Sequence, residues 1–279
     1  MRVLIDYRAA LRERSGVGEY THQLVRALLS AGRDASNPAV DVTVFSSSSR
    51  DRLPDDAEID GAHRVDRRIP VRLLNLAWHR LGWPPVEALA AGHFDIAHSL
   101  HPLLMPARRA AQVVTIHDLN FLRHPERTRA EIRRDYPGLA RAHAHRADQV
   151  IVVSHFTADE VQHLLELPAD RIYVCSPGRP AWTPRPVQPR DGYVLFFGTL
   201  EPRKNIGTLL DAYEELAGRR SNLPELVLAG KATEQSAPWL DRIGRAPLNR
   251  LVRHVGYVAP GERQALYAGA RLLVQPSFE

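Results

Sequence analysis

The sequence predicts an α/β protein with two domains, each built around a parallel sheet. Short runs rich in Val, Ile and Leu alternate with segments in which apolar residues recur at helical spacing. Such near-continuous apolar strands are typical of a parallel sheet that helices cover on both faces. The residues 177–189 contain five prolines, after which the alternation starts again. At 279 residues the chain is long enough for two hydrophobic cores.

We expect a first domain over residues 1–176, a proline-rich linker over 177–191 and a second domain over 192–279. The expected strands are 2–7, 41–45, 94–100, 112–118, 149–153 and 171–175 in the first domain, and 193–198, 225–230, 252–258 and 271–277 in the second. The first expected helix begins near Tyr20 and stops at Gly32, and the others cover 71–91, 126–146, 157–166, 205–217 and 261–270. We expect the carboxyl ends of the two sheets to face a cleft, where such folds bind ligands.

The second domain is expected to be incomplete. Its last strand is followed by Glu279 and no helix, whereas a crossover of this fold needs a helix after the strand. We therefore expect the chain to be a C-terminally truncated version of a longer protein.

Composition excludes several classes of protein. Hydrophobic residues make up 44% and charged residues 25%, as in a globular protein, and no apolar run reaches 18 residues. The N-terminus lacks the pattern of a secretory signal, so we expect a cytoplasmic protein. Cys175 cannot form an internal disulfide and is expected to be a half-buried thiol. The net charge of +5 comes from arginines that are spread along the chain, so we expect no nucleic-acid partner.

Two local patterns concern helix boundaries. Thr157 and Glu160 have the spacing of a capping box, with Phe156 and Val161 at the positions of a hydrophobic staple. This pattern predicts that a helix starts at Thr157. Pro137 is expected to interrupt the helical pattern around it.

A glycine-containing loop stands between the first strand and the first helix. Gly16 and Gly18 would let backbone approach a ligand closely, and the following helix N-terminus offers N–H groups to an anion. Thr21 occupies the third glycine position of the dinucleotide fingerprint, which argues against an NAD site. Ordinary turn chemistry is the alternative explanation for the two glycines.

A His-Asp pair follows the strand at 112–118. At the end of such a strand, His117 and Asp118 are expected to face the cleft. An imidazole there can contact a sugar hydroxyl or transfer a proton. The alternative is that His117 only makes a local hydrogen bond at the strand end. We interpret the other histidines as surface or packing residues, including His93, His98, His101, His143 and His145.

A basic loop follows the first strand of the second domain. Gly198 ends that strand, Arg203 and Lys204 stand next to each other, and Asn205 is suited to cap the next helix. Arg and Lys together suit a diphosphate, because Arg binds two oxygens in a fork and Lys adds a compact charge. A solvated basic loop is the alternative, although Lys204 is one of only two lysines in the chain.

Some signatures are absent from the sequence. No Asp-x-Asp pair suggests a carboxylate-bound Mg²⁺ or Mn²⁺ ion, so we expect no metal site and no cofactor. No GxSxG nucleophile elbow and no GxxxxGK[ST] phosphate loop occurs, which argues against hydrolases and P-loop enzymes.

Six segments, taken together and in order, resemble the retaining family 4 group of GT-B glycosyltransferases. The resemblance extends over essentially the whole chain, and these most specific segments read SGVGEYTHQLVRALL, TIHDLNFLRHPE, VIVVSHFTADEV, GTLEPRKNIGTLLDAY, LVLAGK and VQPSFE. The resemblance implies two Rossmann-like domains, with the acceptor bound mainly by the first and the nucleotide-sugar donor mainly by the second. It also implies a metal-independent transfer of a sugar, with mannose as a candidate, to a glycan or lipid-linked hydroxyl with retained anomeric configuration.

The resemblance assigns roles to residues of the second domain. Arg203 and Lys204 match the basic pair that neutralises the departing diphosphate, and Gly198 matches the backbone that approaches the donor before this pair. Glu279, which alone would be interpreted as a solvent-exposed carboxylate, matches the first glutamate of the E-x7-E motif near the sugar ring.

In the first domain, Gly16 and Gly18 match the loop that approaches the donor phosphates, and His117 matches a residue beside the donor sugar. Two alternatives stay open: a non-catalytic remnant or binding subunit with this fold, and a nucleotide-sugar epimerase. The residues 68–85 mix Arg with Leu and two Trp, so they either contact the inner face of a membrane peripherally or form buried helices.

Overall fold

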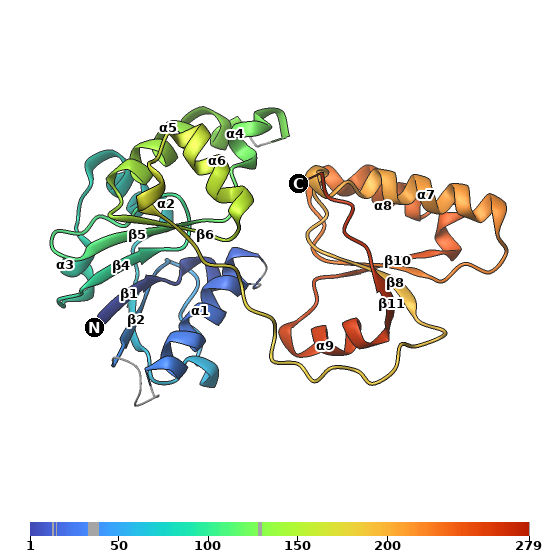
Figure 1. Ribbon diagram of the computed structural model, residues 1–279, viewed down its shortest axis with the longest axis horizontal. Helices are drawn as coiled ribbons and strands as arrows, with labels where there is room; N and C mark the ends of the chain where they lie inside the picture. Colours follow the sequence, from blue (N-terminus) through green and yellow to red (C-terminus); the bar gives the residue numbers. More distant parts are fainter. Residues whose placement is uncertain (13, 15, 33–38, 128–129, 279) are drawn as a thin grey trace. The chain divides into compact units, whose positions relative to one another are not determined.

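The computed structural model describes residues 1–12, 14, 16–32, 39–127 and 130–278. It divides into two compact units, Met1–Gly178 and Arg179–Glu279 (Figure 1). The division lies within the proline-rich segment 177–191.

The first unit contains a sheet of seven parallel strands. Their order is β3-β2-β1-β4-β5-β6-β7, which extends the order of doubly wound folds. The strands are β1 (Arg2–Asp6), β2 (Asp41–Ser47), β3 (His63–Arg67), β4 (Ile96–Ser99), β5 (Ala111–Ile116), β6 (Gln149–Val152) and β7 (Ile172–Val174). The order reverses between β1 and β4, and the carboxyl ends of strands at such a switch point are the usual ligand site.

Side-chain alternation along β1 explains how helices cover both faces of this sheet. Val3 and Ile5 pack with Val25 of α1 on one face, whereas Leu4 packs with Leu74 and Trp78 on the other. The helices are α1 (Val17–Ala31), α2 (Val71–Leu76), α3 (Val86–Ala90), α4 (Asn120–Arg123), α5 (Ala130–Arg146) and α6 (His155–Leu165), and α2 runs directly into the π-helical turn Ala77–Leu81. Figure 1 shows α1 and α5 with the strands between them.

The second unit repeats this plan with four parallel strands in the order β10-β9-β8-β11. The elements are β8 (Tyr193–Phe197), α7 (Ile206–Arg219), β9 (Leu226–Ala229), α8 (Ala237–Ile243), β10 (Val252–Gly256), α9 (Pro260–Gly269) and β11 (Ala270–Leu273). Phe196 packs with Leu210 of α7, and Leu195 packs with Leu266 of α9 on the opposite face. The strand order reverses between β8 and β11.

The structure corrects several expectations. The helical stretch predicted for 71–91 is broken into three pieces, α5 continues through Pro137, and Cys175 is exposed. The sequence gives no sign of β3, a polar edge strand, or of α8. Among the described residues no helix combines the length and the apolar composition that crossing a bilayer requires.

Candidate active site

Two glycines place the start of α1 at the carboxyl edge of the first sheet. Gly16 precedes α1 with φ 50° and ψ −115°, a backbone conformation that side chains disfavour. Gly18 lies against the turn that follows β1, because a Cβ at this position would overlap the carbonyl oxygen of Ala9. The N–H groups of the first helical turn, which have no partners within the helix, are therefore held next to the end of β1.

His117 follows β5 and lies beside this helix. Its Nε2 donates to the carbonyl oxygen of Leu100 at 3.2 Å, and its ring packs edge-on against Tyr20 of α1, with the ring centroids 4.8 Å apart. Burial lowers the pKa of His117 below its usual value, so the imidazole is neutral at pH 7. The structure thus brings together the three site residues predicted in the first unit, His117, Gly16 and Gly18.

A charged cluster that the sequence interpretation missed lies at the switch point. Asp6 ends β1 and accepts from Nε and Nη2 of Arg8 at 2.8 and 2.6 Å, and from Nε2 of His101 at 3.2 Å. Nη1 of Arg8 donates to Asn75 at 2.7 Å, and the guanidinium lies 4.7 Å from the ring centroid of Trp78. His101, interpreted above as a surface or packing residue, belongs to this cluster. An acidic residue at the end of the first apolar strand was the available signal.

The charge of Asp6 is stabilised in place. Burial alone would raise the pKa of this carboxyl, but the adjacent Arg8 guanidinium and the hydrogen bonds from Arg8 and His101 hold it well below its usual range. The cluster is therefore a fixed ion pair rather than a proton donor at neutral pH.

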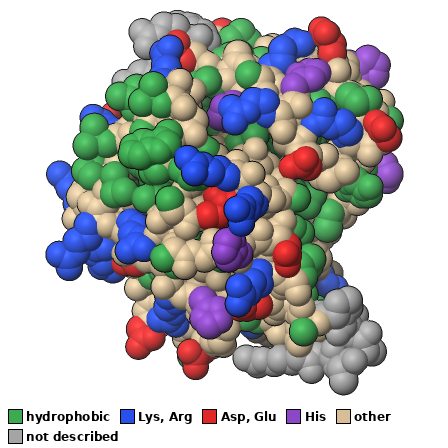
Figure 2. Space-filling model, turned by 90° about the vertical axis from the view of Figure 1, so that its left-hand side faces the viewer, with side chains coloured by type: hydrophobic (Ala, Val, Ile, Leu, Met, Phe, Trp, Pro, Cys, Tyr) green, Lys and Arg blue, Asp and Glu red, His purple; other side chains and the backbone are tan. Residues whose placement is uncertain are grey.

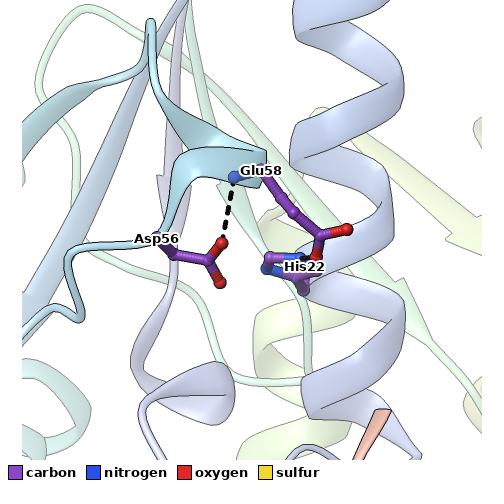
Figure 3. Close-up of side chains that lie close together, drawn as sticks. All are labelled: His22, Asp56 and Glu58. Atoms are coloured by element: carbon purple, nitrogen blue, oxygen red, sulfur yellow. Dashed lines mark hydrogen bonds and ion pairs between the residues drawn. The ribbon is translucent and has the colours of Figure 1, made fainter. Parts of the chain in front are cut away.

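His22, Asp56 and Glu58 form a second cluster (Figure 3). Their ligand atoms lie within 4.8 Å of one another, the one such group found among the described residues. The ring of His22 already bonds Tyr7 Oη through Nδ1 at 2.7 Å and Glu58 through Nε2 at 2.9 Å. Each carboxylate also pairs with an arginine, Arg14 or Arg26. Because these atoms are engaged with one another, the cluster joins α1 to the turn Ala57–Ile59 and is a poor fit for a cation.

In the second unit, two glycines bring the backbone after β9 close to the end of β8. Gly230, directly after β9, has φ 145°, and a Cβ there would overlap the carbonyl of Gly198. His254 Nε2 donates to the carbonyl oxygen of Gly230 at 2.8 Å. The backbone around Gly198 is therefore free of a side chain on the adjacent strand end.

The basic pair lies at the same end of β8. Arg203 and Lys204 belong to the short turn Pro202–Lys204, and Cε of Lys204 lies 3.9 Å from the place a Cβ on Gly198 would take. Nε of Arg203 donates to Glu201 at 2.9 Å, and both side chains are 35% exposed. The structure brings together Gly198, Arg203 and Lys204 next to the switch point of the second sheet.

Asn205 behaves differently from the expected cap. Its backbone is left-handed, with φ 56°, and its carboxamide accepts from the hydroxyl of Thr208 at 2.7 Å instead of from a backbone N–H of α7. Asparagine tolerates this conformation, so the residue is suited to the tight turn more than to capping. The last predicted site residue, Glu279, lies outside the described residues.

Comparisons with known proteins give these features a family. Residues 14–180 match the sequence family Glycosyltransferase Family 4, and residues 183–279 match the family Glycosyl transferases group 1. The chain is 28% identical over 284 residues to O-antigen chain mannosyltransferase B of Escherichia coli, covering 95% of this chain and 73% of that protein.

Solved structures share the fold. Sucrose-phosphate synthase of Thermosynechococcus elongatus superposes with a TM-score of 0.71 at 18% identity, covering 99% of this chain and 75% of that one. Anabaena HepE, in complex with UDP and glucose, superposes with a TM-score of 0.64 at 17% identity, with coverage of 99% and 74%. The two parallel-sheet units are thus those of the GT-B type, and the chain belongs to Glycosyltransferase Family 4 as a hexosyltransferase-type glycosyltransferase.

Proposed function

We propose that this enzyme transfers a mannosyl group from a nucleoside diphosphate sugar to a hydroxyl of a glycan or lipid-linked acceptor. In this proposal the anomeric configuration is retained and no metal ion takes part. The mannosyl group is supported by the similarity to the Escherichia coli mannosyltransferase. A nucleotide-sugar donor is supported by the fold shared with HepE, whose structure holds UDP and glucose.

The observation that carries the proposal is the basic pair at the end of β8. When the sugar leaves the donor, negative charge develops on the diphosphate, and preorganised cations stabilise it most in the transition state. Arg203 supplies a fork of donors and Lys204 a compact charge, and Gly198 places no side chain beside Lys204. Two fixed cations can perform the charge neutralisation that a metal ion performs in other transferases.

We assign the remaining predicted residues to the donor as well. Gly16 and Gly18 would bind its phosphates through the N-terminus of α1, and neutral His117 would contact the sugar, for which an uncharged imidazole is suited as a hydrogen-bond partner. Glu279 is assigned to the neighbourhood of the sugar ring. A peripheral membrane contact through residues 68–85 completes the proposal.

A thermal-shift panel tests the donor site directly. The chain is heated with GDP, UDP, ADP and their sugar conjugates, because a ligand present at 100 times its Kd stabilises the folded state by about 2.7 kcal/mol. We expect one nucleotide to raise the Tm by several degrees and to identify the base of the donor. Cooperative melting with no shift for any nucleotide would contradict the proposal.

A transfer assay tests the chemistry. With GDP-mannose and a glycan acceptor, NMR of the product should show the anomeric configuration of the donor, and excess EDTA should leave the rate unchanged. An inverted product or loss of activity in EDTA would contradict retention or metal independence, respectively.

A further inference from the structure

The segment 71–83 exposes an unusual amount of apolar surface. α2 and the π-helical turn bury Leu74 and Trp78 against the sheet, yet their outer side is also apolar. Five of the thirteen large hydrophobic side chains that are exposed among the described residues lie in this segment, and we call them the apolar ridge: Val71, Leu73, Leu76, Leu81 and Trp83. Leu81 is 74% and Trp83 61% exposed. A helical segment that meets only water would carry polar residues there.

The charged residues of the segment itself are all basic. No acidic residue occurs between Arg67 and Val86, while Arg67, Arg68, Arg72 and Arg80 are exposed. Figure 2 shows one face of the molecule on which hydrophobic side chains gather in one area with Lys and Arg side chains at its border. Apolar side chains inserted between basic ones are the pattern of an element that lies in the interface of an anionic bilayer.

An open groove of about 500 Å³ runs beside the ridge. One wall is formed by the segment 71–83, through Arg72, Asn75, Leu76 and Arg80, and the other by α5, through residues that include Asp135 and Tyr136. Leu76 belongs to both the ridge and the groove, so the two features are continuous.

Two guanidinium groups of the groove are available to an anion. Arg72 makes no ion pair or hydrogen bond with another described residue, and Arg80 reaches Asp135 only at 3.9 Å. Guanidinium groups bind phosphate oxygens in pairs, with charge-assisted hydrogen bonds. Among the described lining residues, two arginines against one carboxylate leave the groove positive.

The groove is connected to the cluster at the switch point of the first sheet. Asn75 lines the groove, and its Oδ1 accepts from Nη1 of Arg8, which pairs with Asp6 at the end of β1. Asn75 therefore links the groove to the carboxyl edge of the sheet, where polar side chains can meet sugar hydroxyls.

We infer that this groove binds the phosphate that joins a lipid-linked acceptor to its saccharide. Arg72 and Arg80 hold the phosphate, the apolar ridge lies in the bilayer beside the lipid, and the saccharide extends toward Asn75 and the end of β1. The inference rests on the proposed function and narrows its acceptor to a saccharide carried on a lipid phosphate.

A binding experiment with a soluble probe tests the groove. Titration calorimetry compares geranyl diphosphate, inorganic diphosphate and geraniol on the wild type, on Arg72→Gln/Arg80→Gln, and on the matched control Arg108→Gln/Arg109→Gln. The control removes the same charge from exposed arginines outside the groove. We expect geranyl diphosphate to bind the wild type and the control, and to bind the groove variant at least tenfold more weakly.

Three results of the calorimetry would overturn the assignment of the groove. Equal affinity of the groove variant and the wild type for geranyl diphosphate would show that Arg72 and Arg80 do not bind it. An equal loss of affinity in the control would show that the effect comes from the net charge of the protein. Inorganic diphosphate binding as tightly as geranyl diphosphate would show a site for a free anion. Sedimentation with phosphatidylglycerol vesicles tests the apolar ridge. The variant Leu81→Ser/Trp83→Ser should no longer sediment with the vesicles, although its Tm is unchanged. Sedimentation equal to that of the wild type would overturn the bilayer contact.

Transfer kinetics separate this inference from the proposed function. With a lipid diphosphate-linked saccharide as acceptor, the groove variant should show a KM for acceptor raised at least tenfold, while the Tm shift caused by the nucleotide stays that of the wild type. Transfer by the groove variant with an unchanged KM for acceptor would overturn the role of the groove and leave the proposed function intact. A wild type that neither binds nucleotide nor transfers sugar would overturn the proposed function.

Discussion

The guanidinium of Arg203 donates to Glu201, although the proposed function assigns it to the donor diphosphate. An incoming phosphate must compete with that carboxylate, and exposed pairs of this kind contribute about 0.2–1 kcal/mol. Glu201→Gln should therefore tighten the binding of the nucleoside diphosphate by up to about fivefold, measured by titration calorimetry. Weaker binding would show instead that Glu201 orients Arg203 for the ligand.

Removal of the guanidinium itself should have a larger effect. Arg203→Ala should lower kcat for sugar transfer roughly 10²–10³-fold, as the loss of one preorganised donor does at other sites that stabilise developing charge. Arg219→Ala is the matched control, because Arg219 is exposed at the other end of α7 and its one ion pair with a described residue is with Glu215. Turnover that is equal in the two variants would exclude Arg203 from the chemistry.

Gly18 is required by the packing of α1 as well as by any ligand. A Cβ there would overlap the carbonyl oxygen of Ala9, a backbone atom that cannot turn away. Gly18→Ala should lower the free energy of unfolding by roughly 1–3 kcal/mol, as overpacking does elsewhere. Gly138→Ala in α5 meets open space and should be neutral or stabilising, because alanine favours helices. Urea unfolding measures the free energy of unfolding of both variants. Equal values would contradict a steric clash at Gly18.

At the scale of elements, α6 shows a competition between two caps. The sequence pattern favours Thr157 as the cap, but α6 begins at His155 and Oγ of Ser154 accepts from the N–H of Thr157 at 3.1 Å. Phe156 is exposed, so the expected staple is absent. A serine three residues ahead of a threonine can cap first, and Thr157 then turns inward and donates to the carbonyl of His117 at 3.4 Å.

Ser154→Ala should therefore destabilise the first unit by about 1 kcal/mol. The control is His155→Ala, which changes an exposed side chain one position further along. Urea denaturation measures both, and a Ser154→Ala variant as stable as the control would assign the cap to Thr157 after all.

The sequence predicts the strands that are apolar and fails at those that are not. The six runs expected in the first unit are all strands, because both faces of the sheet are covered and each run must be apolar. β3 pairs with β2 only, at the edge of the sheet, and its residues, HRVDR, carry no such pattern. Helix ends are harder for a related reason: α5 passes through Pro137, since packing along a long helix outweighs one missing hydrogen bond.

The candidate site divides in the same way. Glycines and a histidine directly after strands are visible in the sequence, because the strand fixes their place at the carboxyl edge. The cluster of Asp6, Arg8 and His101 joins residues about 95 positions apart. It becomes visible only when β1 and β4 are known to be neighbours, which the strand order decides.

At the scale of the whole molecule, the two units apply one plan twice. In the first unit β1 lies between β2 and β4, and in the second β8 lies between β9 and β11. The loop after the first strand of each unit therefore lies where the strand order reverses. Gly16 and Gly18 follow β1, and Gly198, Arg203 and Lys204 follow β8, at equivalent places. The first unit contributes a helix N-terminus there and the second contributes two cations, groups that can bind a phosphate and neutralise a leaving charge, respectively.

Buried histidines should make the stability of the whole chain depend on pH. Burial lowers the pKa of His79, His98 and His143 to about 4 in the folded state, against about 6.5 in the unfolded chain. Between these values the unfolded chain binds more protons than the folded one, so stability falls as the pH decreases from 6.5 to 4. Each histidine contributes a slope of at most about 1.4 kcal/mol per pH unit.

The pKa of Asp6 is depressed, so its contribution is lost only at lower pH, below about 4. Urea unfolding at pH 7.5, 6 and 5 therefore measures the contribution of the histidines without that of Asp6. His98→Gln keeps a donor for Thr115, which His98 Nε2 contacts at 2.8 Å, and should reduce the slope by one proton while the other two histidines still titrate. A free energy of unfolding that is flat from pH 7.5 to 5 in the wild type would mean that the three imidazoles remain accessible to protons in the folded chain.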